Sequence, residues 1–414
     1  MTKPFPGHPL FDTFDHFHRL GRSELFSASS PSVEEFVGNV GVAGALDDYR
    51  YTKSFLSSCN KSHDTYDKFR GDAERFLLWL WLIKEKSVAD VRRSDLEEFL
   101  DFVVTPDPAW IIKDKATRAA PRFIDHEGLR KSNHAWRPFR HRTGQISSSS
   151  IKTLLANLNC YFKYLLEEEY GRGVPVSLVQ KNSRYLTDTS DSNYTERRFK
   201  SLQWEYLLSA AERLADESPA HERTLFVVAT LKALKLRVSE LSDRANWQPV
   251  MSHFFHDTAR GNDFWWLRVF GKGDKKRKVS VPTDYLPYLA RYRASRGLEP
   301  TLPSRGSSEP LVASRSKGKG IGSRQLRNIV DVALKAACDE LTRDGFKQDA
   351  ADLAAATTHW LRHTGASMEI EKGRRPSHTQ ADLGHTSLQT TLNTYHNTDD
   401  DERGHSAHDV VMRD

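Results

Sequence analysis

Several features that would assign this chain to a specialised class are missing from its 414 residues. Its three cysteines are odd in number and far apart, which argues against a disulfide framework or a zinc knuckle. The longest apolar run, residues 76–83, is much shorter than the ~18 residues of a membrane span. Residues 1–10 lack the apolar core of a secretory signal. We therefore expect a cytoplasmic protein with reduced thiols and no membrane partner.

The composition itself is typical of a globular protein with more than one domain. Hydrophobic residues make up 38% of the chain and charged residues 28%. A chain of this length can form two or three domains that each bury a core. The net charge of +6 permits a polyanionic partner, although many globular proteins are mildly basic.

Helical spacing of apolar residues dominates the first half of the chain. Residues 1–44 are polar and interrupted by prolines, and we interpret them as an N-terminal extension. Apolar residues then recur at helical spacing from Asp64 onward, and again from Ile151 to Leu166. Between these two helices, Ser94 and Glu97 look like the capping box of another helix. The pattern predicts a helical domain over residues 45–185.

A basic segment, residues 107–142, interrupts this domain. It holds nine Lys or Arg against four Asp or Glu, an excess of five positive charges, with aromatic residues interleaved. Cations among aromatic rings suit a surface that contacts phosphates and stacks on a base or sugar. A loop held to its own domain by Trp110 and Trp136 explains the pattern equally well. Both interpretations remain open at this point.

The second half predicts a mainly α-helical domain with one β-hairpin. Residues 172–200 are polar and resemble a linker, and we place the second domain at residues 186–414. Residues 264–270 and 278–281 read as two strands around a turn that contains Gly271 and Gly273. Helices are expected in the segments 202–214, 223–234, 285–295 and 323–341, and in one beginning near Thr358.

Six polar residues of the second domain carry the functional signal. His359 and Arg362 are three residues apart, which places both side chains on one face of a helix. Lys272 lies at the tip of the predicted hairpin, in the sequence Gly-Lys-Gly. The complete set is Arg237, Lys272, His359, Arg362, His385 and Tyr395.

These residue types are the ones that phosphodiester cleavage without a metal or cofactor requires. Two guanidiniums can hold the non-bridging oxygens and neutralise the charge that builds in the transition state. Imidazoles can move protons near neutral pH, and a lysine can protonate the departing 5′ oxygen. A tyrosine nucleophile conserves the bond energy for resealing. Each residue alone has an ordinary explanation, such as a surface ion pair or a packed ring, but the combination favours catalysis.

The sequences around these residues resemble, in order, the motifs of the tyrosine recombinases, the phage integrase family. The resemblance covers residues 202–403 well, and the helices of residues 64–171 resemble the family's core-binding domain less specifically. The matching segments are LKLRVSEL at 234–241, GKG at 271–273, HWLRHT at 359–364, LGHTS at 383–387 and TT at 390–391 before Tyr395.

This resemblance implies a two-domain architecture that closes as a C-shaped clamp around duplex DNA. It implies that four copies of the chain assemble on two DNA sites, and that the protein is associated with the nucleoid when bound. Tyr395 would attack the scissile phosphate to form a 3′-phosphotyrosine, and Lys272 would protonate the 5′ hydroxyl. The other implied roles are phosphate binding by Arg237 and Arg362, assistance by His359 and His385, support of the pocket by Glu240, and a structural role for His363.

Further cations are expected to contact DNA, and the departures from the family's compact members bear on its biology. The basic segment and the N-terminal extension favour an enzyme that integrates, excises or transposes a mobile element. Tyr395 follows His385 by ten residues, one more than is usual in the family. The predicted DNA contacts are Lys275, Lys276 and Arg277 in the hairpin and Arg137, Arg140 and Arg142 in the basic segment.

Two alternatives differ in the reaction they imply. A type IB topoisomerase shares this chemistry but relaxes supercoils without exchanging partners, and the Leu-Gly-His motif favours the recombinase instead. A DNA-binding relative that has lost catalysis is opposed by the full set of six residues and favoured by the shifted tyrosine. A covalent protein–DNA adduct would separate the enzyme from the binding protein.

Overall fold

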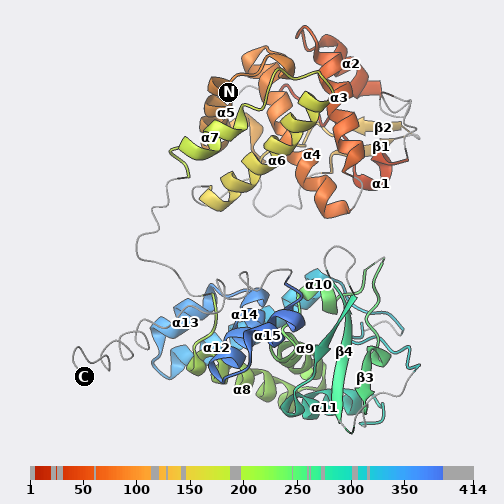
Figure 1. Cartoon of the computed structure of the whole chain (residues 1–414), viewed down its shortest axis with the longest axis vertical. Coiled ribbons are helices and arrows are strands. Elements are labelled where there is room, and N and C mark those ends of the chain that lie inside the picture. The colour runs from red at the N-terminus through yellow and green to blue at the C-terminus, as the bar shows by residue number, and fades with distance from the viewer. Residues whose placement is uncertain are drawn as a thin grey trace, which may run out of the picture. The chain divides into compact units, whose positions relative to one another are not determined.

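A computed structural model shows two compact units, unit 1 (Met1–Asn193) and unit 2 (Tyr194–Asp414) (Figure 1). In the part of the chain that the structure describes, both units are mainly helical and each holds one small sheet, which confirms the expected fold class. Within the described part of the chain, no helix is long and apolar enough to cross a membrane. The structure describes residues 5–19, 25, 31–59, 62–112, 121–126, 129–140, 146–186, 197–244, 246–258, 261, 263–271, 276–300, 306–314 and 318–385.

Unit 1 is a helical domain built around α4 and α6, which pack against each other. Both helices confirm the apolar spacing of the sequence, because the residues of that stripe, such as Phe76 and Leu155, are fully buried. The elements of unit 1 are α1 (Phe14–Phe17), α2 (Pro31–Asn39), α3 (Ala45–Ser58), α4 (His63–Trp79), α5 (Arg93–Val104), β1 (Phe123–His126), β2 (Leu129–Ser132), α6 (Ser148–Glu167) and α7 (Val176–Asn182).

The start of α5 differs from the prediction. The helix begins at Arg93, and the amide of Arg92 donates to the carboxylate of Asp95 at 2.6 Å. Ser94 therefore lies inside the first turn, and the expected capping box of Ser94 and Glu97 is wrong. Asp95 is buried and also accepts a hydrogen bond from Lys86 at 2.7 Å, so its carboxylate both caps the helix and pairs with a lysine that precedes it.

Parts of the segment interpreted as an N-terminal extension contribute to the core of unit 1. Leu10, Phe11 and Phe17 are buried there, together with two residues of α2. The amide of Leu10 donates to the buried carboxylate of Glu74, on α4, at 2.6 Å. These contacts bind residues far apart in the sequence into one hydrophobic core.

The basic segment is held to unit 1 by both its aromatic and its charged residues. Its four aromatic side chains are at most 6% exposed, so these rings are packed rather than available to stack on a base. Arg122 forms an ion pair with the buried Glu74, and Arg130 pairs with Asp12. For the described residues, the structure favours the packing interpretation over the stacking one. The buried aromatic residues are Trp110, Phe123, Trp136 and Phe139.

The first part of the predicted linker is also folded. Residues 176–182 form helix α7, and Val176 and Val179 are buried in the core of unit 1. The linker prediction was wrong here because this segment forms a helix whose two valines pack into the core. Residues 187–196 lie outside the described part of the chain.

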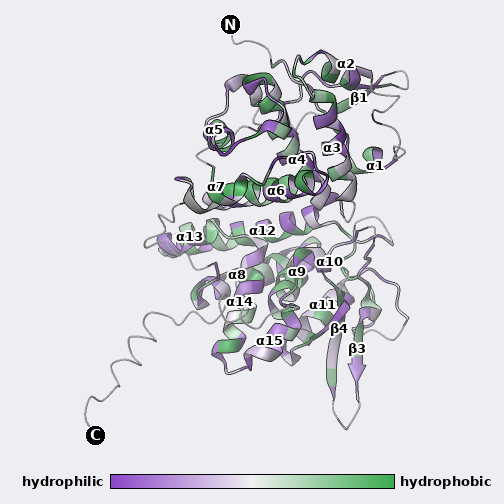
Figure 2. Cartoon of the chain, turned by 45° about the horizontal axis from the view of Figure 1, so that its top comes forward, coloured by the Kyte–Doolittle hydropathy of each residue, from purple (hydrophilic) through white to green (hydrophobic). Residues whose placement is uncertain are grey.

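Helix α9 lies among the other helices of unit 2 (Figure 1), and its residues from Thr224 to Leu231 are all buried. Helices α8, α11, α12 and α14 contact it. Helix α12 is amphipathic, and hydrophobic and hydrophilic residues alternate along it (Figure 2). The helices are α8 (Ser201–Glu217), α9 (Glu222–Ala233), α10 (Val238–Leu241), α11 (Leu286–Ser295), α12 (Ser323–Arg343), α13 (Lys347–Ala354), α14 (Thr358–Glu371) and α15 (Pro376–Leu383).

The sheet of unit 2 has three antiparallel strands in the order β3 (Phe254–Asp257), β4 (Phe264–Phe270) and β5 (Lys276–Ser280). The predicted pair of strands is confirmed by β4 and β5, which pair Val269 with Arg277. The sequence did not predict β3. Leu267, Val269 and Val279 are buried in the core of unit 2, as the two-residue period of a strand requires. Residues 272–275 of the connecting turn lie outside the described residues.

Candidate active site

Arg237 lies in the tight turn between α9 and α10. Helix α9 ends at Ala233, and Lys235 has a left-handed backbone, with φ of +52°, that redirects the chain. Arg237 is then the N-cap residue of α10, and its amide donates to Oε2 of Glu240 at 2.8 Å. Its guanidinium reaches Oε1 of Glu240 at 3.1 Å while the side chain stays 29% exposed. The turn thus anchors this cation and leaves part of it in contact with solvent.

Glu240 is a fully buried carboxylate approached by three arginines, and these four residues are termed the Glu240 cluster. Arg277, on β5, donates two hydrogen bonds to the carboxylate, at 2.6 and 2.9 Å. Arg362, on α14, lies 3.9 Å from Oε2. Burial opposes ionisation, but the hydrogen bonds and charge of Arg277 and the charge of Arg362 outweigh it, and the pKa of Glu240 is lowered. One negative charge therefore faces three positive charges.

Arg362 is 1% exposed and is held by backbone carbonyls from two directions. Its Nη1 donates to the carbonyl of Lys235 at 2.5 Å, and its Nη2 donates to the carbonyl of Leu383 at 2.7 Å. The same Nη2 lies 3.4 Å from Nε2 of His385. A single guanidinium therefore connects the α9–α10 turn with the end of α15 and with His385.

Two glycines permit this close assembly. Gly365, on α14, faces the end of α9, where a Cβ atom would lie only 2.1 Å from the carbonyl oxygen of Lys232. Gly384 ends α15 with φ of +66°, and a Cβ there would lie 3.0 Å from Cδ of Arg277. A glycine is required at the first position by the close approach of two backbones, and favoured at the second by its left-handed conformation.

The histidines near the cluster are held in the neutral form. Burial, followed by the charges of Arg362, Arg237 and Arg277, lowers the pKa of His385 to about 4. Burial, His359 and Arg362 lower the pKa of His363 to about 4. The pKa of His359 is lowered as well, by burial and then by Arg362 and Arg237. The rings of His359 and His363 meet edge to face, with centroids 4.5 Å apart.

The structure brings together four of the six residues predicted to act in catalysis: Arg237, His359, Arg362 and His385. Lys272 and Tyr395 lie outside the described residues, as do Lys275 and Arg142 among the predicted DNA contacts. The other predicted contacts differ in their surroundings. Lys276 and Arg140 are exposed, Arg277 belongs to the Glu240 cluster, and Arg137 donates to backbone carbonyls of its own segment.

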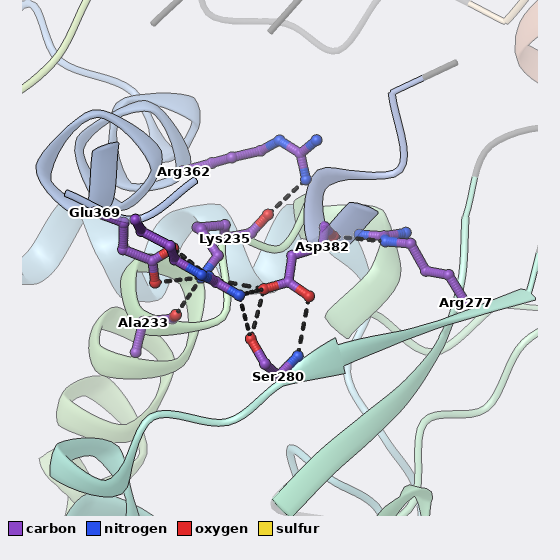
Figure 3. Close-up of polar contacts among 8 residues, drawn as sticks. Ala233, Lys235, Arg277, Ser280, Arg362, Glu369 and Asp382 are labelled. Atoms are coloured by element: carbon purple, nitrogen blue, oxygen red, sulfur yellow. Dashed lines mark hydrogen bonds and ion pairs between the residues drawn. The ribbon is translucent and has the colours of Figure 1, made fainter. Parts of the chain in front are cut away.

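Sequence reasoning missed a second charged group beside the Glu240 cluster. Lys235, Glu369, Asp382, Arg374 and Ser280, termed the Lys235 cluster, form a network of ion pairs and hydrogen bonds (Figure 3). A lysine two residues before Arg237 is an ordinary residue in the sequence. Nothing in the pattern indicates that its backbone is left-handed or that its ammonium is buried.

The arrangement can bind an anion with two non-bridging oxygens. Within the Glu240 cluster the positive charges outnumber the negative ones by two, and Arg237 is partly exposed. Guanidiniums fixed by a buried carboxylate and by backbone carbonyls need little reorganisation when charge develops on a phosphate. Each neutral imidazole beside them offers one ring nitrogen that accepts a hydrogen bond and one N–H that donates one.

Curated proteins resemble this chain over most of their length. It is 27% identical over 297 residues to tyrosine recombinase XerC of Pelobacter propionicus, an overlap of 70% of this chain and 80% of XerC. It is 23% identical over 252 residues to tyrosine recombinase XerD of Staphylococcus epidermidis, an overlap of 59% of this chain and 70% of XerD.

Solved structures with the same fold include recombinases bound to DNA. The fold resembles that of XerH site-specific recombinase in a post-cleavage complex with a palindromic difH substrate, with a TM-score of 0.54, 17% identity, and coverage of 97% of this chain and 99% of the other. It also resembles that of the Tn1549 transposon integrase in complex with circular intermediate DNA, with a TM-score of 0.51, 16% identity, and coverage of 86% and 97%.

Residues 197–402, most of unit 2, match the family model described as the phage integrase family. The matched span contains all four residues that the structure brings together, and it extends through Lys272 and Tyr395. This chain therefore belongs to the phage integrase family, and it is a tyrosine-type site-specific recombinase that cleaves and rejoins DNA strands.

Proposed function

We propose that unit 2 cleaves DNA with Tyr395 as the nucleophile and that the Glu240 cluster binds the scissile phosphate. The phenolic oxygen attacks phosphorus, a 3′-phosphotyrosine bond forms, and the bond to the 5′ oxygen breaks. Lys272 protonates that leaving oxygen, and the reverse reaction rejoins the strand. Because the phosphate ester is exchanged rather than hydrolysed, resealing needs no external energy source.

The observation that carries this proposal is the shared carboxylate of Glu240. It contacts Arg237 and lies 3.9 Å from Arg362, so the two guanidiniums come close together although 125 residues separate them. The hydrogen bonds of Arg277 occupy both oxygens of Glu240, which leaves the partly exposed Arg237 poorly neutralised. A phosphate that bridges the first two arginines would supply the missing negative charge.

The histidines fit a role in proton transfer. His385 is 3.4 Å from Arg362 and has a pKa of about 4, so it is neutral at pH 7 and able to accept a proton from the attacking phenol. His359 would then hydrogen-bond the phosphate. A bound phosphate offsets the surrounding positive charge, which raises the basicity of His385 when the proton must be taken up.

We further propose that four copies act on two specific duplex sites at the ends of a mobile element, with the two units of each copy holding the DNA. In support, the fold resembles that of the Tn1549 transposon integrase, which was solved in complex with circular intermediate DNA. Exposed Lys276 and Arg140 suit phosphate contacts, whereas Arg277 suits support of Glu240. Integration or excision joins two duplex sites, which have four strands, so four copies supply one nucleophile for each strand.

The test recovers the covalent intermediate directly. Cells that express the full chain with a plasmid library of the DNA flanking its gene are lysed rapidly in denaturant. DNA that stays attached to the protein is then sequenced. We expect attachment through a 3′ end at a narrow set of sequences, and loss of the attached DNA in Tyr395→Phe with DNA affinity unchanged. Sites at both ends of one element would support the mobile-element assignment, and a single chromosomal site would oppose it.

A matched control is Tyr288→Phe, which removes a hydroxyl that donates to Glu212 on α8, and it should yield as much attached DNA as the wild type. An adduct that persists in Tyr395→Phe would place the nucleophile elsewhere. Attachment spread without sequence preference, with relaxation of supercoils, would indicate a topoisomerase activity. Tight DNA binding with no adduct in the wild type would indicate a relative that has lost catalysis.

A further inference from the structure

Two features of the position of Lys235, the backbone conformation and the burial, disfavour a lysine there. Its φ of +52° lies in the left-handed region, which glycine adopts at little cost and a side chain with a Cβ does not. Its side chain is 0% exposed, and a buried ammonium needs compensating partners. The described residues include two other non-glycine residues with positive φ, Glu85 and Glu169, and neither is buried. A residue that carries both penalties must make strong contacts through its side chain.

The ammonium of Lys235 makes such contacts with two carboxylates. Nζ lies 2.5 Å from Oε1 of Glu369 and 3.7 Å from Oδ2 of Asp382, and it donates to the carbonyl of Ala233 at 3.2 Å (Figure 3). Burial lowers the pKa of Lys235, and the two carboxylates oppose that shift. The ammonium thereby joins the α9–α10 turn to α14, through Glu369, and to α15, through Asp382.

Arg374 and Ser280 complete the Lys235 cluster. Arg374, between α14 and α15, pairs with Glu369 and donates to Asp382 at 2.7 Å and to the hydroxyl of Ser280 at 2.8 Å. Ser280, at the end of β5, donates from its hydroxyl and its amide to Asp382, at 2.6 and 3.1 Å. Two cations and two carboxylates balance, so the cluster has no net charge, unlike the Glu240 cluster.

The elements joined by the Lys235 cluster are those that carry the predicted catalytic residues. Arg237 follows Lys235 by two residues in the same turn, and the carbonyl of Lys235 accepts a hydrogen bond from Arg362. His385 follows Asp382 by three residues, across the C-cap Gly384. Figure 3 shows the Lys235 ammonium and the Arg362 guanidinium on either side of the Lys235 backbone. A displacement of the ammonium would therefore move the turn and the end of α15 together.

We propose that Lys235 is a positioning residue for strand cleavage, whose buried ammonium fixes Arg237, Arg362 and His385 relative to one another. It does not touch the substrate. It acts through the carbonyl that Arg362 binds and through the carboxylate that holds α15. This proposal rests on the proposed function, because it assigns those three residues to one phosphate. The Lys235 cluster, which has no net charge, holds the elements in place. The Glu240 cluster supplies the positive charge that binds the phosphate.

The test compares three substitutions of Lys235 in the full chain. Lys235→Met keeps the side-chain length and deletes the charge, Lys235→Arg keeps the charge, and Lys235→Gly relieves the backbone while deleting the side chain. On DNA already bound, we expect Lys235→Met and Lys235→Gly to form the covalent adduct about 10- to 100-fold more slowly at unchanged DNA affinity. Lys235→Arg should retain most of the rate. Lys232→Met, which removes a lysine three residues earlier that lies over Trp204, is the matched control.

Two further measurements keep the proposal testable in every case. The NMR titration of the His385 ring requires no DNA and should change in Lys235→Met but not in Lys232→Met. If Lys235→Met folds poorly, the double variant Lys235→Met, Glu369→Gln restores charge balance and should recover folding but not the cleavage rate. Wild-type adduct rates and an unchanged His385 titration in Lys235→Met would overturn the proposal. A wild-type protein that forms no adduct would refute the proposed function, while the titration would still test the positioning role.

Discussion

The basic segment of unit 1 and the Glu240 cluster of unit 2 differ in how their buried charges are balanced. In unit 1, Arg122 and Arg130 of the basic segment are each matched by a carboxylate, Glu74 and Asp12. In unit 2, three arginines gather around the single carboxylate of Glu240. In a matched pair, the attraction between the two charges offsets the hydration that each loses, and the pair holds its segments together. An unmatched group of cations instead keeps its affinity for an anion that arrives from outside.

The histidines report the same difference. Burial and a neighbouring histidine lower the pKa of His18 in unit 1, and no arginine contributes to the shift. In unit 2 the charges of Arg362, Arg237 and Arg277 add to burial and lower the pKa of His385 to about 4. The lowered pKa of His385 thus reflects the local excess of positive charge. An excess of like charge that shifts a neighbouring pKa is typical of a site that binds an oppositely charged ligand.

The largest expected effect comes from changing one arginine of each unit to lysine. Arg362→Lys should slow covalent adduct formation about 10²–10³-fold, because an ammonium cannot reproduce the fork of hydrogen bonds that holds a phosphate. Arg122→Lys should leave that rate unchanged and lower the free energy of unfolding by about 1–3 kcal/mol. Single-turnover cleavage and urea denaturation measure the two effects. Slow cleavage in Arg122→Lys would mean that unit 1 also contributes to the chemistry.

A smaller effect concerns pH. The unfolded chain protonates His363 and His385 near their ordinary pKa of ~6.5, but the folded chain does so only near pH 4. Between these values the unfolded state binds more protons, so stability should fall as the pH decreases from about 6.5 toward 4. Thermal unfolding across this range measures the fall. In His363→Gln the fall should be shallower.

The pKa values of His385 and His18 should also respond differently when DNA is bound. Duplex DNA with the cleavage site should raise the pKa of His385 by roughly one unit or more, because the phosphate offsets the arginines. The pKa of His18 should not change, since burial and the neighbouring His63 lower it and no arginine contributes. NMR titration of the histidine rings in Tyr395→Phe, with and without DNA, measures both. Equal shifts in both units would remove the basis of the comparison.

The smallest expected effect tests whether any cation of the basic segment contacts DNA. Arg140 is exposed, whereas Arg130 pairs with Asp12 and Asp125. Arg140→Gln should reduce the slope of log affinity against log salt by about 0.9, the value for one lost phosphate contact. Arg130→Gln should leave the slope unchanged. If Arg140→Gln also leaves it unchanged, Arg140 makes no phosphate contact.

Much of this architecture could be predicted because local physics decides it. The apolar stripe of α6 and the alternation in β4 arise from the periods of helix and strand, and both were predicted. Strand β3 was missed because its four residues are too few to show a period. The cap of α5 was predicted wrongly, because Arg92 and Asp95 have the same three-residue spacing as Ser94 and Glu97, and the pair of Lys86 with the buried Asp95 accompanies the earlier start.

The candidate site divides in the same way. The sequence by itself determined the reactive residue types and the motifs around Arg237, Arg362 and His385, because reactive chemistry is a property of side chains. The tertiary structure alone decided how they are held: by Glu240 shared among three arginines, and by Lys235 buried with two carboxylates. Burial and charge balance depend on contacts between segments more than 100 residues apart in the sequence. A local sequence pattern does not show such contacts.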